Sequence, residues 1–222
     1  MTGLLRRSEL ALPACNDHMF AKGASSGADL VFLDLEDATP VSLKVESRAK
    51  AIKALNELDW GHTARAIRIN GLDTPWCHDD LIEVVTGAGA NLDTVVIPKA
   101  LTARDVWWVD VMLTQLEEKL GLSKKIRLEV LIEEVEGLAN AEEIVRASPR
   151  LDAVIFGVGD FSLSQGARVD TNFDPLDPYP GDFWAYARNK VMVAARIAGI
   201  DAIDSPYPDY QNLAGYEAEA RR

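Results

Sequence analysis

The sequence contains few cysteine, histidine and basic residues, and each shortage excludes a class of protein. Only 2 of the 222 residues are cysteine, and Cys15 and Cys77 lie far apart, so a disulfide framework is not expected and a reducing cytoplasm is the expected compartment. The 3 histidines show no ligand spacing with one another or with the cysteines. Lys and Arg number 23 against 35 Asp and Glu, a formal net charge of −12.

This acidic balance disfavours nucleic acid and anionic membranes as partners, because both attract a basic face. No apolar run approaches the roughly 18 residues of a membrane span, and the first residues lack the pattern of a signal peptide. A polyanionic ligand would need a local basic patch. Arg6, Arg7 and Lys22 are the candidates for it, although they could equally be scattered surface charges.

Short apolar runs alternate with longer segments of helical period along the whole chain, which predicts βα units around a parallel sheet. In the segment 109–120, the apolar residues fall on one helical face, and a further helix is expected over about 182–198 with Gly199 after it. The proline-rich stretch 170–182 is expected to be a loop. The expected strands are 9–13, 29–35, 65–69, 94–98, 126–132, 153–156 and 200–203.

This pattern predicts a single α/β domain over residues 1–222, a TIM (β/α)8-type barrel that lacks the last strand and a C-terminal lid. A dinucleotide-binding sheet is less favoured, because no G-x-G-x-x-G opens a helix after the first strand. In a barrel, the carboxyl ends of the strands converge on one face, where active sites lie.

Two acidic residues, Glu133 and Asp160, follow consecutive predicted strands. Mg²⁺ typically binds one or two protein carboxylates and completes its octahedron with water and substrate oxygens, so the pair predicts a magnesium site. The alternative for each acid is a helix cap or a pair with a lysine. Gly157 and Gly159 flank Asp160 and would let the backbone approach a ligand closely.

Arg68 ends a strand in which Ile67 and Ile69 are expected to face the helices, so that Arg68 points into the barrel. A fixed guanidinium there could stabilise an oxyanion, or it could form a structural ion pair with Glu36 or Asp37. These two acids could orient Arg68 or hold metal-bound water, and Asp37 could equally cap the next helix. Lys99 is expected to be a charge partner for the acidic rim rather than a Schiff-base lysine, because neighbouring carboxylates raise its pKa.

Six stretches of the chain resemble the citrate lyase β-subunit-like branch of the HpcH/HpaI aldolase family, and within it the malyl-CoA lyases. They are RSELALP at 7–13, FLDLEDA at 32–38, IRINGLDT at 67–74, IPK at 97–99, EVLIE at 129–133 and FGVGD at 156–160. The resemblance implies a TIM barrel, a Mg²⁺ ion that Mn²⁺ could replace, and reversible cleavage of a CoA thioester.

By motif, the resemblance implies that Glu133 and Asp160 bind the metal and that Arg68 contacts the substrate oxygens. It places Lys22 near CoA, and Gly159, Asp160, Ile203 and Asp204 around a small keto acid. The chain departs from the family at 14–16, where Ala-Cys-Asn stands in place of a Gly-Ser-Arg type run, and at Glu134-Val135, where Thr-Ala is common.

The function expected from this resemblance is a Mg²⁺-dependent carbon–carbon lyase, in a homo-oligomer (trimer or hexamer). Its substrate would be a 3-hydroxyacyl-CoA such as malyl-CoA, β-methylmalyl-CoA or citramalyl-CoA, cleaved to a 2-oxo acid and a short acyl-CoA. The alternatives are a thioesterase on the same scaffold, a citrate lyase β subunit acting on a carrier-protein thioester, and a non-catalytic scaffold barrel.

Overall fold

The computed structural model of the protein describes residues 4–221. Seven parallel strands form one sheet in chain order, so each strand pairs with the next along the sequence. They are β1 (Glu9–Pro13), β2 (Leu30–Asp34), β3 (Ala64–Arg68), β4 (Thr94–Ile97), β5 (Arg127–Ile132), β6 (Leu151–Phe156) and β7 (Asp201–Ile203). All seven predicted strands are therefore confirmed, with ends that differ by at most two residues.

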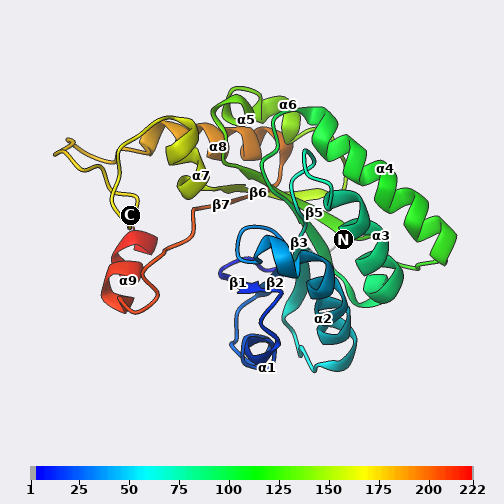
Figure 1. Ribbon diagram of the computed structural model, residues 1–222. Helices are drawn as coiled ribbons and strands as arrows, with labels where there is room; N and C mark the ends of the chain where they lie inside the picture. Colours follow the sequence, from blue (N-terminus) through cyan, green and yellow to red (C-terminus); the bar gives the residue numbers. More distant parts are fainter. Residues whose placement is uncertain (1–3, 222) are drawn as a thin grey trace.

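Helices follow the strands along the chain, and most of them cover the outer face of the curved sheet (Figure 1). They are α1 (Phe20–Ala24), α2 (Lys44–Glu57), α3 (Cys77–Ala88), α4 (Ala103–Leu120), α5 (Val135–Ala139), α6 (Ala141–Ile144), α7 (Val158–Ser164), α8 (Ala185–Ala198) and α9 (Leu213–Arg221). Helix α4 begins with a capping box of Thr102 and Asp105 and ends at Gly121, whose φ of 64° is left-handed. The predicted apolar face of α4 is confirmed, because Val109 and Leu113 are fully buried.

The sheet is an open, seven-stranded parallel half-barrel, the coarser form of the expected TIM-type barrel. Among residues 4–221, no strand joins β7 to β1, so these two are the edges. The α/β architecture is as predicted, and the absence of an eighth strand from the described residues agrees with the sequence. Helix α9 (red in Figure 1) lies apart from the sheet and buries none of its residues.

Successive side chains along each strand point to opposite faces of the sheet, so the apolar residues form two clusters, one on each face. Residues such as Ile67 pack outward against the helices, and Ala66 and Val96 face inward with Leu4 of the N-terminal segment. This confirms that Ile67 faces the helices and that Arg68, one residue on, points to the concave side. The expected loop at 170–182 is also present, and α8 begins at Ala185 rather than 182, because the Asp182 carboxylate accepts the Trp184 N–H in a preceding turn.

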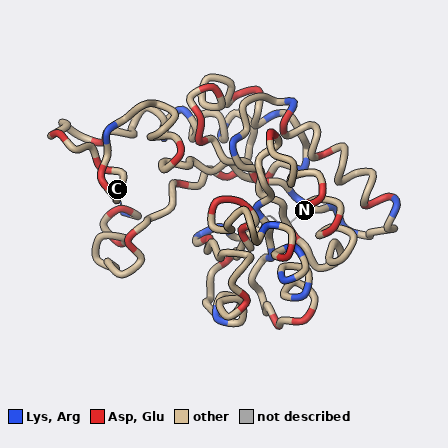
Figure 2. Tube along the Cα trace, viewed as in Figure 1, with Lys and Arg blue, Asp and Glu red and all other residues tan. Residues whose placement is uncertain are grey.

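Of the two alternatives for Arg6, Arg7 and Lys22, the structure favours separate charges over one basic patch. Arg6 is buried and donates to Glu129 Oε1 at 2.7 Å, and Arg7 pairs with Asp29 at 2.6 Å. Both arginines precede β1 and therefore lie at the amino-terminal rim of the sheet, whereas Lys22 follows β1 on α1. Figure 2 shows Lys and Arg interspersed with Asp and Glu along the trace. No helix in the described part of the chain has the length and hydrophobicity of a membrane span.

Candidate active site at the carboxyl ends of the strands

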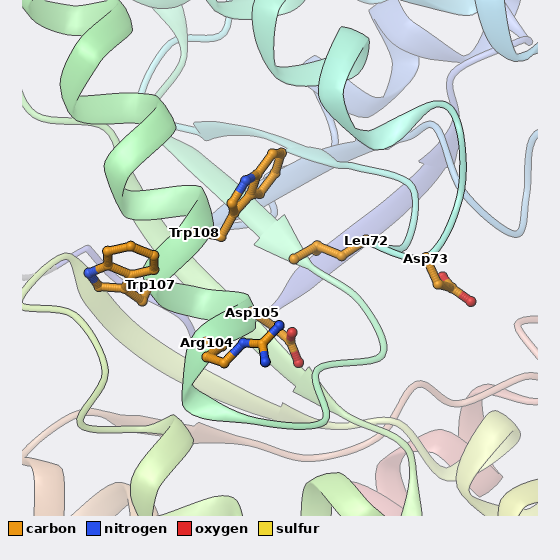
Figure 3. A pocket seen from close by; sticks show the side chains of 6 residues that line it. All are labelled: Leu72, Asp73, Arg104, Asp105, Trp107 and Trp108. Atoms are coloured by element: carbon orange, nitrogen blue, oxygen red, sulfur yellow. The ribbon is translucent and has the colours of Figure 1, made fainter.

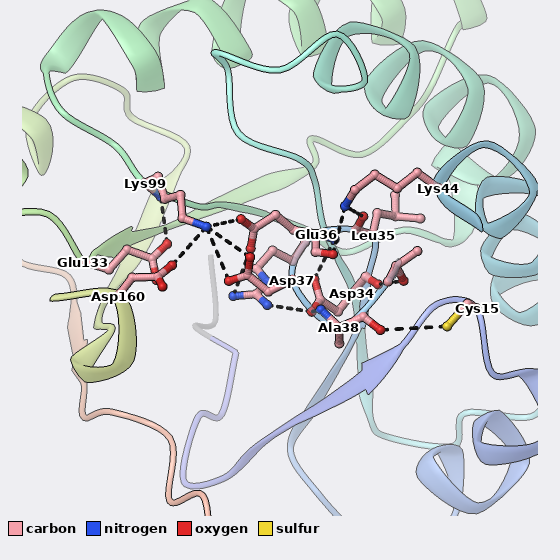
Figure 4. A network of polar contacts seen from close by, with 12 residues as sticks. Cys15, Asp34, Leu35, Glu36, Asp37, Ala38, Lys44, Lys99, Glu133 and Asp160 are labelled. Carbon is pink, nitrogen blue, oxygen red and sulfur yellow. Dashed lines mark hydrogen bonds and ion pairs between the residues drawn. The ribbon is translucent and has the colours of Figure 1, made fainter. Parts of the chain in front are cut away.

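Side chains from the ends of five neighbouring strands form one polar network (Figure 4). Arg68 is the last residue of β3, and Lys99, Glu133 and Asp160 follow β4, β5 and β6. Glu36 and Asp37 follow β2. The strand-end residues that the sequence singled out are thus brought together, because consecutive parallel strands present their carboxyl ends at the same rim.

The Arg68 guanidinium is held by a residue to which the sequence analysis gave no role. Its Nε and Nη2 donate to the two carboxylate oxygens of Asp34, at 2.8 and 2.6 Å, while Glu36 Oε2 lies 3.5 Å from Nη1. Of the two acids offered as ion-pair partners of Arg68, Glu36 is in contact with it, whereas Asp37 pairs with Lys99. Burial opposes charge on Arg68, but the hydrogen bonds and charge of Asp34 outweigh it, and the pKa is raised.

Asp34 is fixed in place by hydrogen bonds to residues close to it in the sequence. Its carboxylate accepts the backbone N–H groups of Glu36 and Ala38, both at 2.9 Å, which closes the turn after β2. Strand pairing then sets Asp34 directly beside Arg68. Asp34 rather than Asp37 stabilises this turn, and Asp37 caps no helix.

Lys99 connects the acidic residues. Its ammonium contacts the Glu36 carboxylate, Asp37 Oδ1 at 3.1 Å and Asp160 Oδ2 at 2.9 Å, while its backbone N–H donates to Glu133 Oε1 at 2.9 Å. Burial acts to lower the pKa of Lys99, but the contacts to Glu36 and Asp160 raise it overall. The lysine is therefore cationic, as expected for a charge partner and not for a Schiff-base nucleophile.

Glu133 is more deeply buried than Asp160, the other predicted metal ligand, and only 3% of the residue is exposed. Burial raises its pKa to about 8, although the Arg68 guanidinium and the Lys99 N–H act against this rise. Gly157 makes room for the carboxylate, because a Cβ atom there would lie 2.6 Å from Glu133 Oε2. Gly157 therefore leaves space for the Glu133 side chain. The sequence had suggested only that it leaves space for a ligand.

The donor set fits a hard divalent ion. Five carboxyl groups, of Asp34, Glu36, Asp37, Glu133 and Asp160, face two cationic side chains, so negative charge is in excess. Glu36 Oε2 is buried without a hydrogen bond. Within residues 4–221, no cluster of three or more acidic, His or Cys side chains forms a metal site by itself. Two carboxylates completed by water and substrate remain compatible with Mg²⁺.

Gly159 also lies at the rim. A Cβ atom there would lie 3.3 Å from the Phe173 ring, so the 170–182 loop packs directly over this glycine. The loop therefore borders the space beside Asp160.

Three predicted substrate residues lie outside the network of Figure 4. Lys22 is exposed on α1, and no contact joins it to Arg68 or Asp160 in the described chain. Ile203 is the last residue of β7 and Asp204 follows it; both line a separate hollow with Phe156 and Arg188, where Asp204 Oδ1 accepts from Arg188 Nε at 3.0 Å.

A further pocket opens where α4 begins, beside the loop that follows β3 (Figure 3). Its lining side chains are Leu72, Asp73, Arg104, Asp105, Trp107 and Trp108. Trp108 packs against the core, whereas Trp107 is 57% exposed. None of the predicted site residues lines this pocket, so the strand-end network remains the candidate active site.

Comparison with known proteins identifies the family. A family model described as HpcH/HpaI aldolase/citrate lyase matches residues 7–222. The chain is 38% identical to L-malyl-CoA/beta-methylmalyl-CoA lyase of Cereibacter sphaeroides, over 97% of this chain and 71% of that protein. It is 32% identical to malyl-CoA/beta-methylmalyl-CoA/citramalyl-CoA lyase of Chloroflexus aurantiacus, over 87% of this chain and 60% of that one.

Solved structures of other proteins share this fold. The crystal structure of protein CitE from Mycobacterium tuberculosis in complex with magnesium, acetoacetate and coenzyme A superposes with a TM-score of 0.77 at 26% identity, covering 98% of this chain and 73% of that one. The sequence match extends over almost the whole chain and the named relatives are lyases. The chain belongs to the HpcH/HpaI aldolase/citrate lyase family, an enzyme family of lyases and aldolases.

Proposed function

We propose that the protein is a Mg²⁺-dependent carbon–carbon lyase that cleaves a 3-hydroxyacyl-CoA, such as malyl-CoA, β-methylmalyl-CoA or citramalyl-CoA, into a 2-oxo acid and a short acyl-CoA. One observation supports this more than any other. A rigidly held guanidinium, Arg68, shares a buried rim with Glu133 and Asp160. The names of the relatives from Cereibacter and Chloroflexus agree with this substrate class.

Glu133 and Asp160 are the proposed ligands of the Mg²⁺ ion, for which Mn²⁺ would substitute. When bound, the ion would supply Lewis-acid polarisation of the hydroxyl and carboxylate oxygens of the substrate. Glu36 and Asp37 both form ion pairs with Lys99, and Glu36 also forms one with Arg68. Their proposed role is to keep both cations in position beside the substrate.

The proposed role of Arg68 follows from the electron flow of the cleavage. The hydroxyl group loses its proton, the bond between the carbinol carbon and the carbon next to the thioester breaks, and the electron pair moves toward the thioester oxygen. Arg68 would stabilise the enolate oxygen that forms, and a proton delivered to its carbon completes the acyl-CoA. Because Asp34 holds the guanidinium in advance, little reorganisation is needed as this charge develops.

The remaining assignments concern substrate and assembly. We propose that Lys22 contacts the CoA moiety, and that Gly159, Asp160, Ile203 and Asp204 surround the 2-oxo acid. A single-domain subunit in a cytoplasmic homotrimer or homohexamer completes the proposal, and light scattering would establish the subunit number.

A product assay tests the function. The protein is incubated with malyl-CoA, citramalyl-CoA and β-methylmalyl-CoA, with and without a chelator, and every product is identified. Glyoxylate or pyruvate together with an acyl-CoA, lost on chelation, supports the lyase. Free CoA with the intact hydroxy acid would identify a thioesterase instead, and turnover of a carrier-protein thioester alone would identify a citrate lyase β subunit.

Glu133→Gln is the matched variant for this assay. It preserves the shape of the buried side chain but removes the carboxylate that would bind the ion, so we expect activity to be lost while the far-UV circular dichroism spectrum is unchanged. Equal activity in Glu133→Gln and wild type would contradict the assignment. A wild-type protein without turnover of any thioester would favour the scaffold alternative.

A further inference from the structure

The Lys99 side chain contacts one of the two proposed metal ligands directly. Its Nζ lies 2.9 Å from Asp160 Oδ2 and also contacts Glu36 and Asp37 (Figure 4). The backbone of the same residue binds the other proposed ligand through the hydrogen bond from Lys99 N to Glu133 Oε1. One residue therefore connects both carboxylates, one through its side chain and one through its main chain.

An ammonium group and a divalent cation compete for the same oxygen lone pairs. With Nζ at 2.9 Å from Asp160 Oδ2, a divalent ion on this carboxylate would lie close to a positive charge, and the two would repel each other. The geometry lets Lys99 release Asp160 without losing all its partners, because Nζ has two further acceptors in Glu36 and Asp37. The ammonium can therefore withdraw by a small movement and remain paired.

The backbone of Lys99 is held in a conformation that only a specific environment stabilises. Its φ is 49°, in the left-handed region that most side chains avoid. In this conformation the Lys99 N–H donates to Glu133 Oε1 at 2.9 Å, a bond that does not involve the side chain. The side-chain contacts can thus be removed by mutation while the main-chain bond to Glu133 stays.

We propose that Lys99 is a positioning residue that competes with the divalent ion for Asp160 and so sets how tightly the site binds that ion. In the absence of the ion, the ammonium neutralises the clustered carboxylates and holds them together. When the ion binds, Asp160 is exchanged from the ammonium to the metal, and Lys99 stays with Glu36 and Asp37. This inference rests on the proposed function, because it adopts Glu133 and Asp160 as the metal ligands.

The test is Mn²⁺ binding, measured by titration calorimetry and by the electron paramagnetic resonance of free Mn²⁺, in wild type, Lys99→Met and Lys99→Gln. Removing one positive charge a few ångströms from the ion should tighten Mn²⁺ binding about tenfold in both variants. A residue with a merely structural role would weaken binding when it is replaced. Lys124→Met is the matched control, because Lys124 forms an ion pair with Asp93 at 2.8 Å outside the network, and its Mn²⁺ affinity should equal that of wild type.

Thermal unfolding gives a second measurement. With a chelator present, Lys99→Met should melt below wild type, because the carboxylates then lack their counter-charge, and added Mn²⁺ should raise its melting temperature more than that of wild type. Lys99→Gln, which keeps a hydrogen-bond donor, covers the case in which Lys99→Met does not fold.

The outcomes separate this inference from the proposed function. If wild type binds Mn²⁺ and both Lys99 variants bind it equally or more weakly, the competition is refuted and the metal site stands. If only the variants bind Mn²⁺, competition is supported in its strongest form. If no protein binds the ion at millimolar concentration, both the metal site and the competition are refuted.

Discussion

Asp34 and Arg68 are paired residues on adjacent strands, and two parallel hydrogen bonds of 2.8 and 2.6 Å join their side chains. Such a bidentate pair fixes the plane of the guanidinium as well as its position. Asp34 is 1% exposed, so the Arg68 guanidinium is held from its buried side.

Asp34→Asn should lower kcat by about ten- to a hundredfold, the usual effect of removing a residue that orients a functional group. The amide can accept a hydrogen bond from Arg68 but lacks the charge and the second acceptor. Steady-state kinetics with the preferred thioester would measure this effect. Asp93→Asn is the control, because Asp93 pairs with Arg65 at 3.0 Å near the opposite end of the same strand, and kcat should not change in it.

Arg68→Lys should reduce kcat by about a hundredfold or more while the protein remains folded. Lysine keeps the positive charge but cannot form the two parallel bonds to Asp34 or present a planar donor to the enolate oxygen. Kinetics and circular dichroism would be measured on the same preparation. A variant with wild-type kcat would mean that charge alone is sufficient and that the fixed geometry has no role.

Gly157→Ala should weaken Mn²⁺ binding and lower activity together, because its Cβ atom would lie 2.6 Å from Glu133 Oε2 and displace the carboxylate. Gly89→Ala is the matched control. Its Cβ atom would meet the Leu122 side chain at 2.9 Å, a flexible neighbour outside the site, so we expect a loss of stability with unchanged Mn²⁺ affinity. Equal Mn²⁺ affinity in wild type and Gly157→Ala would show that Glu133 is not a ligand.

Stability should depend on pH through the ionic cluster at the amino-terminal rim, where Glu9 lies beside Arg6, Glu129 and Asp201. Burial raises the pKa of Glu9 to about 8, the Glu129 charge adds to this rise, and Arg6 opposes it. Between about pH 4.3, the ordinary pKa of a glutamate in the unfolded chain, and about pH 8, Glu9 is therefore protonated in the folded protein and ionised in the unfolded chain. The free energy of unfolding should fall as pH rises between these two values.

Glu9→Gln removes this proton exchange and should flatten that dependence. Urea unfolding at about pH 5.5 and about pH 8 would measure the difference in wild type and variant. The remaining charged groups of the cluster, Arg6, Arg127, Glu129, Asp152 and Asp201, are unchanged in the variant. A pH dependence as steep as that of wild type would assign the proton to one of the other carboxyl groups.

Local sequence patterns were enough to predict the strands, their parallel arrangement and the acids and arginine at their ends. These features are local, because apolar runs, turn residues and strand alternation depend on neighbours in the chain. Arg68 could be placed on the concave face from Ile67 and Ile69 alone, and Glu133 could be recognised as a strand-end acid.

The contacts between charged side chains, in contrast, depend on how the elements pack in three dimensions. Arg68 pairs with Asp34 because β2 and β3 lie in one particular register, and Arg6 is buried against Glu129 because the N-terminal segment enters the concave side of the sheet. Lys99, after β4, contacts Glu36 and Asp37 in the loop after β2 and Asp160 in α7, all distant from it in sequence. Ionic contacts act through space between residues on different elements, and no periodicity along the chain encodes them.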